Sequence, residues 1–171
     1  MRSLNPRLLT WDDITSAVSR VTDAITSSGY EVEVVVGMLR GGVIPAVLVA
    51  DRLGVKDIGV MDIKFYEAPG VTGKEPYLRQ PLTLPIRDKN VLIVDDISDT
   101  GLTLKVALDV VRHYAPRSVR TATLYVKPWT KLTPDYYAFV TEDWVVFPWD
   151  FWEHGRLVEV PSAVVFKRVT S

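Results

Sequence analysis

The stretch from residue 91 to residue 104, VLIVDDISDTGLTL, decides the fold of this chain. Four aliphatic residues lead directly into Asp95 and Asp96, and a third acid, Asp99, precedes a Thr-Gly pair. The aliphatic run predicts a buried strand, and ligands of an open parallel sheet bind beyond the carboxyl ends of its strands. Charge is costly in a low dielectric unless something opposes it. The three acids therefore predict a cation, a sugar or a phosphate at this position.

The residues after the acids predict a phosphate cradle. Consecutive backbone N–H groups of residues 100–103 can point into one concavity, two threonine hydroxyls add donors, and the start of a helix adds partial positive charge. Gly101 can adopt a positive φ without steric cost. Adjacent carboxylates ahead of such a cradle fit a ribose phosphate, in which Asp95 and Asp96 bind the 2′- and 3′-hydroxyls and the loop holds the 5′-phosphate.

Three alternatives explain less of the stretch. A Walker B strand also ends in two acids, but the sequence contains no G-x-x-x-x-G-K-[ST] motif. A phospho-acceptor receiver domain begins with a similar strand, but too few residues follow it here for five strands. In the third alternative the acids have only a structural role: they lie at the solvated end of a strand, and Asp99 caps the next helix. This alternative explains one acid well and all three poorly.

Length and composition favour one domain over residues 1–171, with 47% hydrophobic residues, 24% charged residues and a net charge of −1. This balance gives no support for bulk binding to nucleic acid or to an anionic membrane. The absence of cysteine excludes disulfides and thiolate chemistry, and two histidines are too few for a histidine-based metal centre. No apolar run approaches the length of a membrane span and the first residues do not resemble a signal peptide, so we expect a cytoplasmic protein.

Strand and helix patterns alternate along the chain, which predicts an α/β fold with a mostly parallel sheet covered on both faces. Thr10 and Asp13 form a weak capping box ahead of the first helix. We expect helices at residues 11–28, 44–53 and 102–114, strands at 31–36, 57–65, 91–94 and 119–126, and a glycine-rich turn at 37–42.

Two segments depart from this alternation. Residues 66–85 are rich in proline and glycine and are long enough to form a mobile lid, although an irregular surface hairpin is the alternative. The aromatic tail from residue 139 onward is interpreted as an appended subdomain. We therefore predict a core over residues 10–127 and a small hood over residues 128–171.

The motif VLIVDDISDTGLTL resembles the phosphoribosyl pyrophosphate (PRPP) signature of type I phosphoribosyltransferases. This resemblance implies their fold, a mostly parallel twisted sheet flanked by helices with a small aromatic-rich hood at the carboxyl end. It also implies that the residues binding ribose and 5′-phosphate are Asp95, Asp96, Ser98, Asp99, Thr100, Gly101, Leu102 and Thr103. The turn MLRGG resembles the family's pyrophosphate loop, which assigns Leu39, Arg40 and Gly41 to the leaving group.

The carboxyl end is similar to bacterial xanthine-guanine and archaeal 6-oxopurine phosphoribosyltransferases. The resemblance implies that Lys127 donates to the 6-oxygen of the base, that Trp144 stacks on the purine and that the backbone of Val145 reads its edge. A Pro-Trp-Asp sequence ending at Asp150 completes the predicted base site, and Thr10-Trp-Asp also fits this subgroup. Trp149, Phe151 and Trp152 are interpreted as packing or interface residues.

The implied reaction joins a 6-oxopurine (hypoxanthine, guanine or xanthine) to PRPP and gives a purine nucleoside 5′-monophosphate and pyrophosphate. Mg²⁺ is the implied cofactor, held by Asp95 and Asp96 directly or through water and PRPP, and these acids also favour the oxocarbenium-like ribose. Asp99 is the candidate for proton transfer at N7 of the purine. The alternatives are a regulator of the same fold that binds PRPP or a nucleotide without turnover, and an enzyme for adenine or a pyrimidine. The aromatic carboxyl-terminal region predicts a homodimer or homotetramer.

Overall fold

The computed structural model describes residues 6–66 and 75–151. Residues 67–74 of the predicted lid and residues 152–171 of the predicted hood lie outside these ranges. No helix within them is long and apolar enough to cross a membrane. The elements in chain order are β1 (Pro6–Leu8), α1 (Trp11–Ser27), β2 (Val34–Met38), α2 (Val43–Leu53), β3 (Asp57–Tyr66), β4 (Glu75–Gln80), β5 (Asn90–Ser98), α3 (Leu102–Arg112), β6 (Ser118–Val126), β7 (Tyr136–Val140) and β8 (Trp144–Val146).

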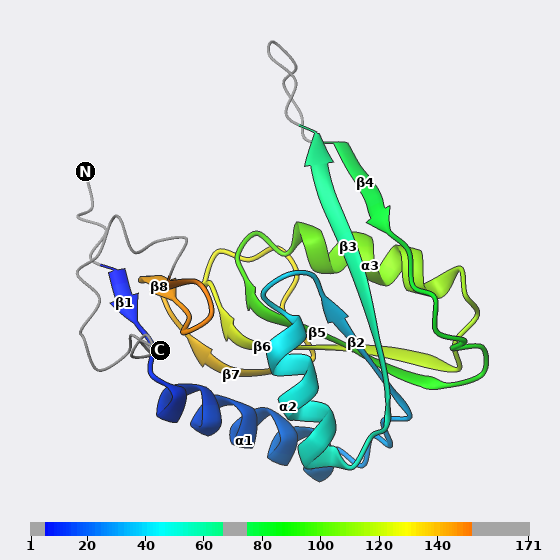
Figure 1. Cartoon of the computed structure of the whole chain (residues 1–171), viewed down its shortest axis with the longest axis horizontal. Coiled ribbons are helices and arrows are strands. Elements are labelled where there is room, and N and C mark those ends of the chain that lie inside the picture. Colours follow the sequence, from blue (N-terminus) through cyan, green and yellow to red (C-terminus); the bar gives the residue numbers. More distant parts are fainter. Residues whose placement is uncertain (1–5, 67–74, 152–171) are drawn as a thin grey trace, which may run out of the picture.

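The central sheet has six strands in the order β4-β3-β2-β5-β6-β7. Every pair in it is parallel except β3 with β4, which is antiparallel. β1 and β8 form a separate two-stranded parallel sheet, which lies at one end of the molecule (Figure 1). The predicted α/β architecture with a mostly parallel sheet is confirmed.

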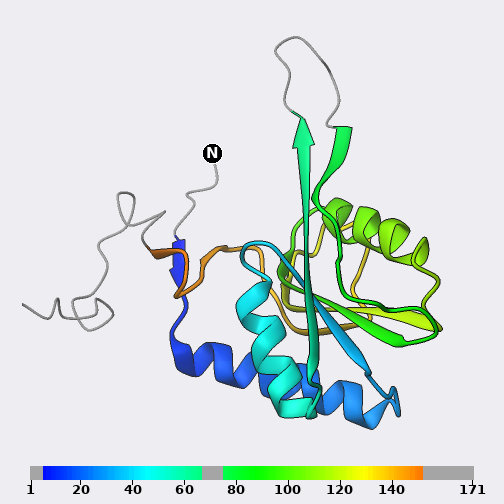
Figure 2. The ribbon, with the colours of Figure 1, turned by 45° about the vertical axis from the view of Figure 1, so that its right-hand side comes forward.

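Helices cover both faces of the sheet, α1 and α2 on one side and α3 on the other (Figures 1 and 2). The alternation of side chains along β2 explains the two cores. Val35 packs with α1 and α2, whereas Val34 and Val36 pack on the side of α3. A strand buried on both faces needs apolar residues at every position, which is why the sequence shows continuous aliphatic runs.

Helix α1 begins with the capping box predicted from Thr10 and Asp13. The Thr10 hydroxyl accepts a hydrogen bond from the N–H of Asp13 at 3.2 Å, and the Asp13 carboxylate accepts one from the N–H of Thr10 at 2.8 Å. The hydrogen bonds that the Asp13 carboxylate accepts from the N–H and from the hydroxyl of Thr10 lower the pKa of Asp13. Gly29 follows the helix with φ +71°, a conformation that glycine adopts without strain.

Two strands differ from their predicted bounds. β2 begins at Val34 rather than at residue 31 and continues through Gly37 and Met38, because these two residues pair with β3. β5 continues to Ser98 rather than ending at residue 94, because β6 runs beside it for its whole length. Asp95 and Asp96 therefore lie in the last part of the strand and not beyond it.

The segment predicted as a lid contains a strand. β4 pairs with β3 in a hairpin that extends beyond the rest of the sheet (Figure 2). Asp62 of β3 is 1% exposed and forms ion pairs with Arg79 of β4 and with Lys64. Residues 75–80 are therefore part of a hairpin, as in the alternative, with a register shift between Asp62 and Ile63. Movement of the segment as a lid stays a prediction.

The aromatic tail is shared between the two sheets. β7 pairs with β6 and forms the edge of the central sheet, so this sheet extends past the predicted core boundary at residue 127. β8 pairs with β1, a strand that the sequence did not predict. A three-residue strand such as β1 has too short a pattern to be read from sequence.

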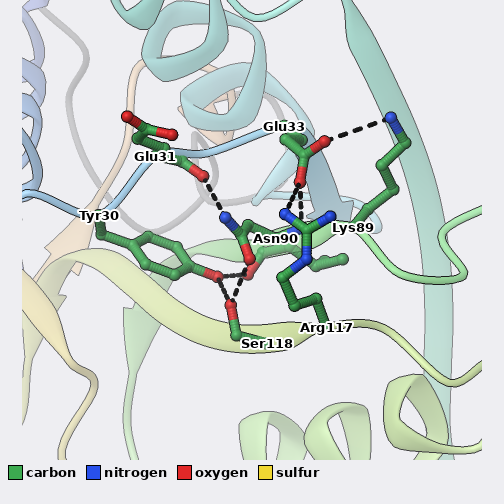
Figure 3. Close-up of polar contacts among 8 residues, drawn as sticks. Tyr30, Glu31, Glu33, Lys89, Asn90, Arg117 and Ser118 are labelled. Carbon is green, nitrogen blue, oxygen red and sulfur yellow. Dashed lines mark hydrogen bonds and ion pairs between the residues drawn. The ribbon is translucent and has the colours of Figure 1, made fainter.

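A polar network closes the amino ends of the central strands (Figure 3). Glu33, just before β2, binds the N–H of Asn90 and forms ion pairs with Lys89 and Arg117. The N–H of Asn90 and the neighbouring cations lower the pKa of Glu33. This network lies at the amino ends of the strands, opposite to the predicted site at their carboxyl ends.

Candidate active site

The predicted site residues outside β8 and the turn after it lie at the carboxyl ends of β2, β5 and β6. Residues 39–42 follow β2, residues 99–101 follow β5, and the segment of residues 127–132 follows β6. The chain adds β3 on one side of β2 and adds β6 and β7 on the other side of β5, so the strand order reverses between β2 and β5. Such a switch point is where open α/β sheets bind ligands.

The turn after β2 lies directly against the acidic pair. A Cβ atom on Gly41 would overlap the Asp96 carboxylate, and one on Gly42 would lie 2.6 Å from the carbonyl oxygen of Val94. Only glycine permits this approach. The peptide bond between Leu39 and Arg40 is cis, and the side chain of Arg40 is exposed. The predicted pyrophosphate residues thus lie beside the predicted ribose residues.

The two carboxylates of β5 are half-buried neighbours. Asp95 Oδ1 accepts a hydrogen bond from the N–H of Asp96 at 3.0 Å, and Asp96 Oδ1 accepts one from the N–H of Ile97 at 2.7 Å. Burial, followed by the charge of Asp96, raises the pKa of Asp95 well above its ordinary value. Burial raises the pKa of Asp96 to about 6, and the charge of Asp150 acts in the same direction.

These carboxylates fit a magnesium site that the substrate completes. Among the described residues no group of three or more histidine, aspartate and glutamate side chains could hold a metal ion. Mg²⁺ is usually held by one or two carboxylates together with waters and substrate phosphates. Two acids whose ionisation is disfavoured would gain a counter-charge from such a cation. The donor set therefore suits magnesium bound together with a phosphorylated substrate.

The loop before α3 has the positive φ that was predicted at Gly101. Gly101 is the N-cap of α3, has φ +81° and provides no side-chain cap, so the first turn of this helix keeps donors for a ligand. Thr100 is exposed, and its hydroxyl accepts a hydrogen bond from the N–H of Leu102 at 3.3 Å. Thr103 is half-buried in the first turn. Ser98 differs, because its hydroxyl is buried and lies 3.1 Å from Thr130 Oγ1.

The proposed base residues lie beside this loop. Lys127 is only 8% exposed, and its ammonium donates to the backbone carbonyl of Asp143. Asp99 is exposed and accepts a hydrogen bond from Nε1 of Trp129 at 2.8 Å. Sequence reasoning missed Trp129 and Asp143. Trp129 lies two residues after Lys127, and Asp143 lies one residue before Trp144. This closeness in sequence to predicted site residues was the only signal that could have identified them.

The remaining base residues lie in β8 and the turn after it. Trp144 is half-buried, whereas Val145 is buried and pairs with Arg7 of β1. The N–H of Asp150 donates to the carbonyl of Phe147 at 2.9 Å, and the charge of Asp150 acts on Asp96. Asp150, which was predicted to bind the base, therefore also interacts electrostatically with Asp96 of the acidic pair.

Trp149 is a packing residue, as interpreted from the sequence. Its ring stacks on Phe147 with 4.9 Å between centroids and an interplanar angle of 11°, and it also contacts Trp11 at 5.9 Å. Phe151 is 7% exposed. Trp152 lies outside the described residues.

Residues 7–153 match the family described as "Phosphoribosyl transferase domain". The chain belongs to this family. It is 31% identical over 144 residues to a xanthine-guanine phosphoribosyltransferase from Gluconobacter oxydans, covering 83% of each protein. The structure resembles a purine phosphoribosyltransferase from Pyrococcus horikoshii, with a TM-score of 0.78, 36% identity and coverage of 96% of this chain and 99% of that one. A hypoxanthine phosphoribosyltransferase from Staphylococcus aureus aligns with a TM-score of 0.68 and 27% identity, covering 79% and 76% of the two chains.

Membership in the phosphoribosyl transferase family agrees with the grouping of the site. The turn after β2, the acids of β5 and the cradle before α3 lie together at one edge of the sheet. The individual roles of these residues remain predictions.

Proposed function

We propose that this chain transfers the 5-phosphoribosyl group of PRPP to a 6-oxopurine base (hypoxanthine, guanine or xanthine), releasing pyrophosphate and a purine nucleoside 5′-monophosphate. The observation that carries this proposal is the place of the acidic pair of β5. On one side Asp96 touches the turn at Gly41, and on the other side the strand leads into the cradle at Gly101. PRPP has the same order of groups, with a ribose diol between a pyrophosphate and a 5′-phosphate.

The ribose phosphate is assigned to β5 and the cradle. Asp95 and Asp96 accept hydrogen bonds from the 2′- and 3′-hydroxyls, which satisfy carboxylates that burial has made costly to ionise. The first-turn N–H groups of α3 and the hydroxyls of Thr100 and Thr103 bind the 5′-phosphate.

The transfer breaks the bond between C1 of the ribose and the pyrophosphate oxygen and forms a bond from a purine nitrogen to C1. Positive charge develops on the ribose ring, where Asp95 and Asp96 oppose it, and negative charge develops on the leaving group. Arg40 and the backbone of Leu39 and Gly41 bind that leaving group. Mg²⁺, when bound, supplies further charge neutralisation for the pyrophosphate.

Recognition of the base is assigned to residues after β6 and in β8. Lys127 keeps two N–H donors beyond the one directed at Asp143, and a donor pairs with an oxygen at position 6 but not with an amino group. Asp99 takes up the proton from N7 of the base. Trp144 stacks on the purine, while the backbone of Val145 and the carboxylate of Asp150 bind its edge.

Release of pyrophosphate tests this function. The purified protein is supplied with PRPP and Mg²⁺, with each base in a separate reaction, and pyrophosphate is measured over time. We expect release that requires both an oxopurine and Mg²⁺. Binding of PRPP without release in the presence of any base would reject the enzyme and support the regulator of the same fold. Release with adenine or a pyrimidine but with no oxopurine would reject the proposal that the base is a 6-oxopurine.

Self-association and the cellular compartment stay predictions. The homodimer or homotetramer expected from the aromatic carboxyl-terminal region is tested by light scattering of the purified protein. A monomer across a range of concentrations would refute it. We expect the protein in the cytoplasm, where fractionation of cells would detect it.

A further inference from the structure

We propose that Trp129 is a positioning residue for the transfer step, because its side chain contacts both Asp99 and Lys127. This inference rests on the proposed function. Nε1 of Trp129 donates to Asp99 Oδ1 at 2.8 Å. The ammonium of Lys127 lies 5.2 Å from the centroid of the Trp129 ring, within the range of a cation–π contact. One indole thus joins the group assigned to the proton of N7 and the group assigned to the 6-oxygen.

A tight turn fixes the place of Trp129. The N–H of Thr130 donates to the carbonyl of Lys127 at 3.1 Å, so the four residues from Lys127 to Thr130 form a β-turn. Pro128 occupies the second position of this turn, where its restricted φ is favourable. Trp129 occupies the third position, and its side chain remains 48% exposed.

The segment of residues 127–132 is also bonded to the loop that carries Asp99. The carbonyl of Ser98 accepts from the N–H of Lys127 at 2.9 Å, and the carbonyl of Thr100 accepts from the N–H of Lys131 at 3.0 Å. Asp99 lies between these two anchored residues. Its backbone is therefore held opposite Trp129, and the indole bond then fixes the remaining freedom, that of the carboxylate itself.

The indole is suited to this task chemically. Its N–H is only a donor, so it orients the carboxylate without competing for a proton. With Oδ1 held by this bond, the second carboxylate oxygen, Oδ2, keeps one orientation relative to Lys127. An exposed aspartate would otherwise exchange between rotamers, and small errors of placement at a reacting group cost rate. Trp129 thereby sets the relative position of the two groups that read the base.

Two substitutions separate the contacts of Trp129. Trp129→Phe keeps an aromatic face for Lys127 and removes the N–H, and we expect kcat to fall on the order of 10-fold, the size expected for one lost bond to a charged group, with the KM for PRPP unchanged. Trp129→Leu removes both contacts and should also raise the KM for the base. Tyr137→Phe is the control, because Tyr137 is an aromatic residue 42% exposed on the edge strand β7 and should keep wild-type kinetics.

A double-mutant cycle with Asp99→Ala tests whether Trp129 acts through Asp99. If it does, Trp129→Phe causes no further loss of kcat once the carboxylate is absent. Equal losses in both backgrounds would overturn the proposal, as would a Trp129→Phe variant with wild-type kcat. Circular dichroism and thermal unfolding of each variant verify the folded state. A wild-type protein without turnover on any base would reject the proposed function, whereas an active wild type with additive losses rejects only the role of Trp129.

Discussion

Gly41 and Asp96 touch across the two halves of the sheet, since a methyl group on Gly41 would overlap Oδ2 of the Asp96 carboxylate. This contact joins the turn assigned to pyrophosphate to the acid assigned to ribose. The residues assigned to these two groups of PRPP therefore lie in direct contact.

Gly41→Ala should impair PRPP binding while leaving the fold intact. The added methyl group must displace the Asp96 carboxylate, so we expect kcat/KM for PRPP to fall at least about 10-fold, as for a misplaced binding group. Steady-state kinetics with varied PRPP measures the effect. Gly29→Ala is the control, because Gly29 has φ +71° and no atoms within 4 Å of an added Cβ. It should cost stability, about 1–2 kcal/mol, and leave kcat/KM unchanged. Wild-type kinetics for Gly41→Ala would contradict the assigned contact.

Asp96→Asn should stabilise the ligand-free protein at high pH. The pKa of Asp96 is raised from 3.8 to about 6 in the folded state. Its contribution to stability is therefore full below the unfolded value and is lost as the pH rises through about 6. An uncharged asparagine escapes this loss, so at about pH 8 the free energy of unfolding should exceed that of wild type by on the order of 1–3 kcal/mol.

Urea unfolding at about pH 4 and pH 8 checks this prediction for Asp96. The gain should disappear at the lower pH, where the wild-type carboxyl is protonated. The same variant should lose most of its activity, because it no longer opposes charge on the ribose. An equal difference in stability at both pH values would show that the substitution acts through packing rather than through charge.

Asp99→Asn should slow the chemical step. An amide in place of the carboxylate retains an acceptor for Trp129 but cannot take up the proton of N7. We expect kcat to decrease on the order of 10²–10⁴-fold, the usual contribution of a general base. The KM for PRPP should change little. An unaltered kcat in this variant would remove Asp99 from the proton-transfer step.

Lys127→Ala should relax the choice of base. Removing the ammonium abolishes the donor to the 6-oxygen, so kcat/KM for an oxopurine should fall on the order of 10–100-fold while adenine is rejected less strongly. Lys131→Ala is the matched control, because this exposed lysine contacts the cradle through its backbone N–H and not through its side chain. Retention of full oxopurine activity by Lys127→Ala would show that another group reads position 6.

The fold and the family could be predicted because several short patterns agreed. The aliphatic runs at β2 and β5 reflect strands buried on both faces, and the glycines of the turn after β2 occupy positions where a side chain would clash. The comparisons confirm the predicted family and fold.

The features that were missed depend on contacts distant in sequence. β1 exists because β8 pairs with it, and the contact of Trp129 with Asp99 joins residues 30 positions apart. β4 was hidden because Pro76 within it and the proline- and glycine-rich residues around it are typical of a loop, whereas pairing with β3 fixed it as a strand. Pairing of this kind leaves little trace in local composition.

One competition reaction tests the central claim most directly. The purified protein is given PRPP, Mg²⁺ and equal concentrations of guanine, hypoxanthine, xanthine and adenine together, and the nucleotides formed are resolved by chromatography and mass spectrometry. The proposed site predicts monophosphates of one or more oxopurines and little or no adenosine monophosphate. Adenosine monophosphate as the main product, or no nucleotide at all, would contradict it.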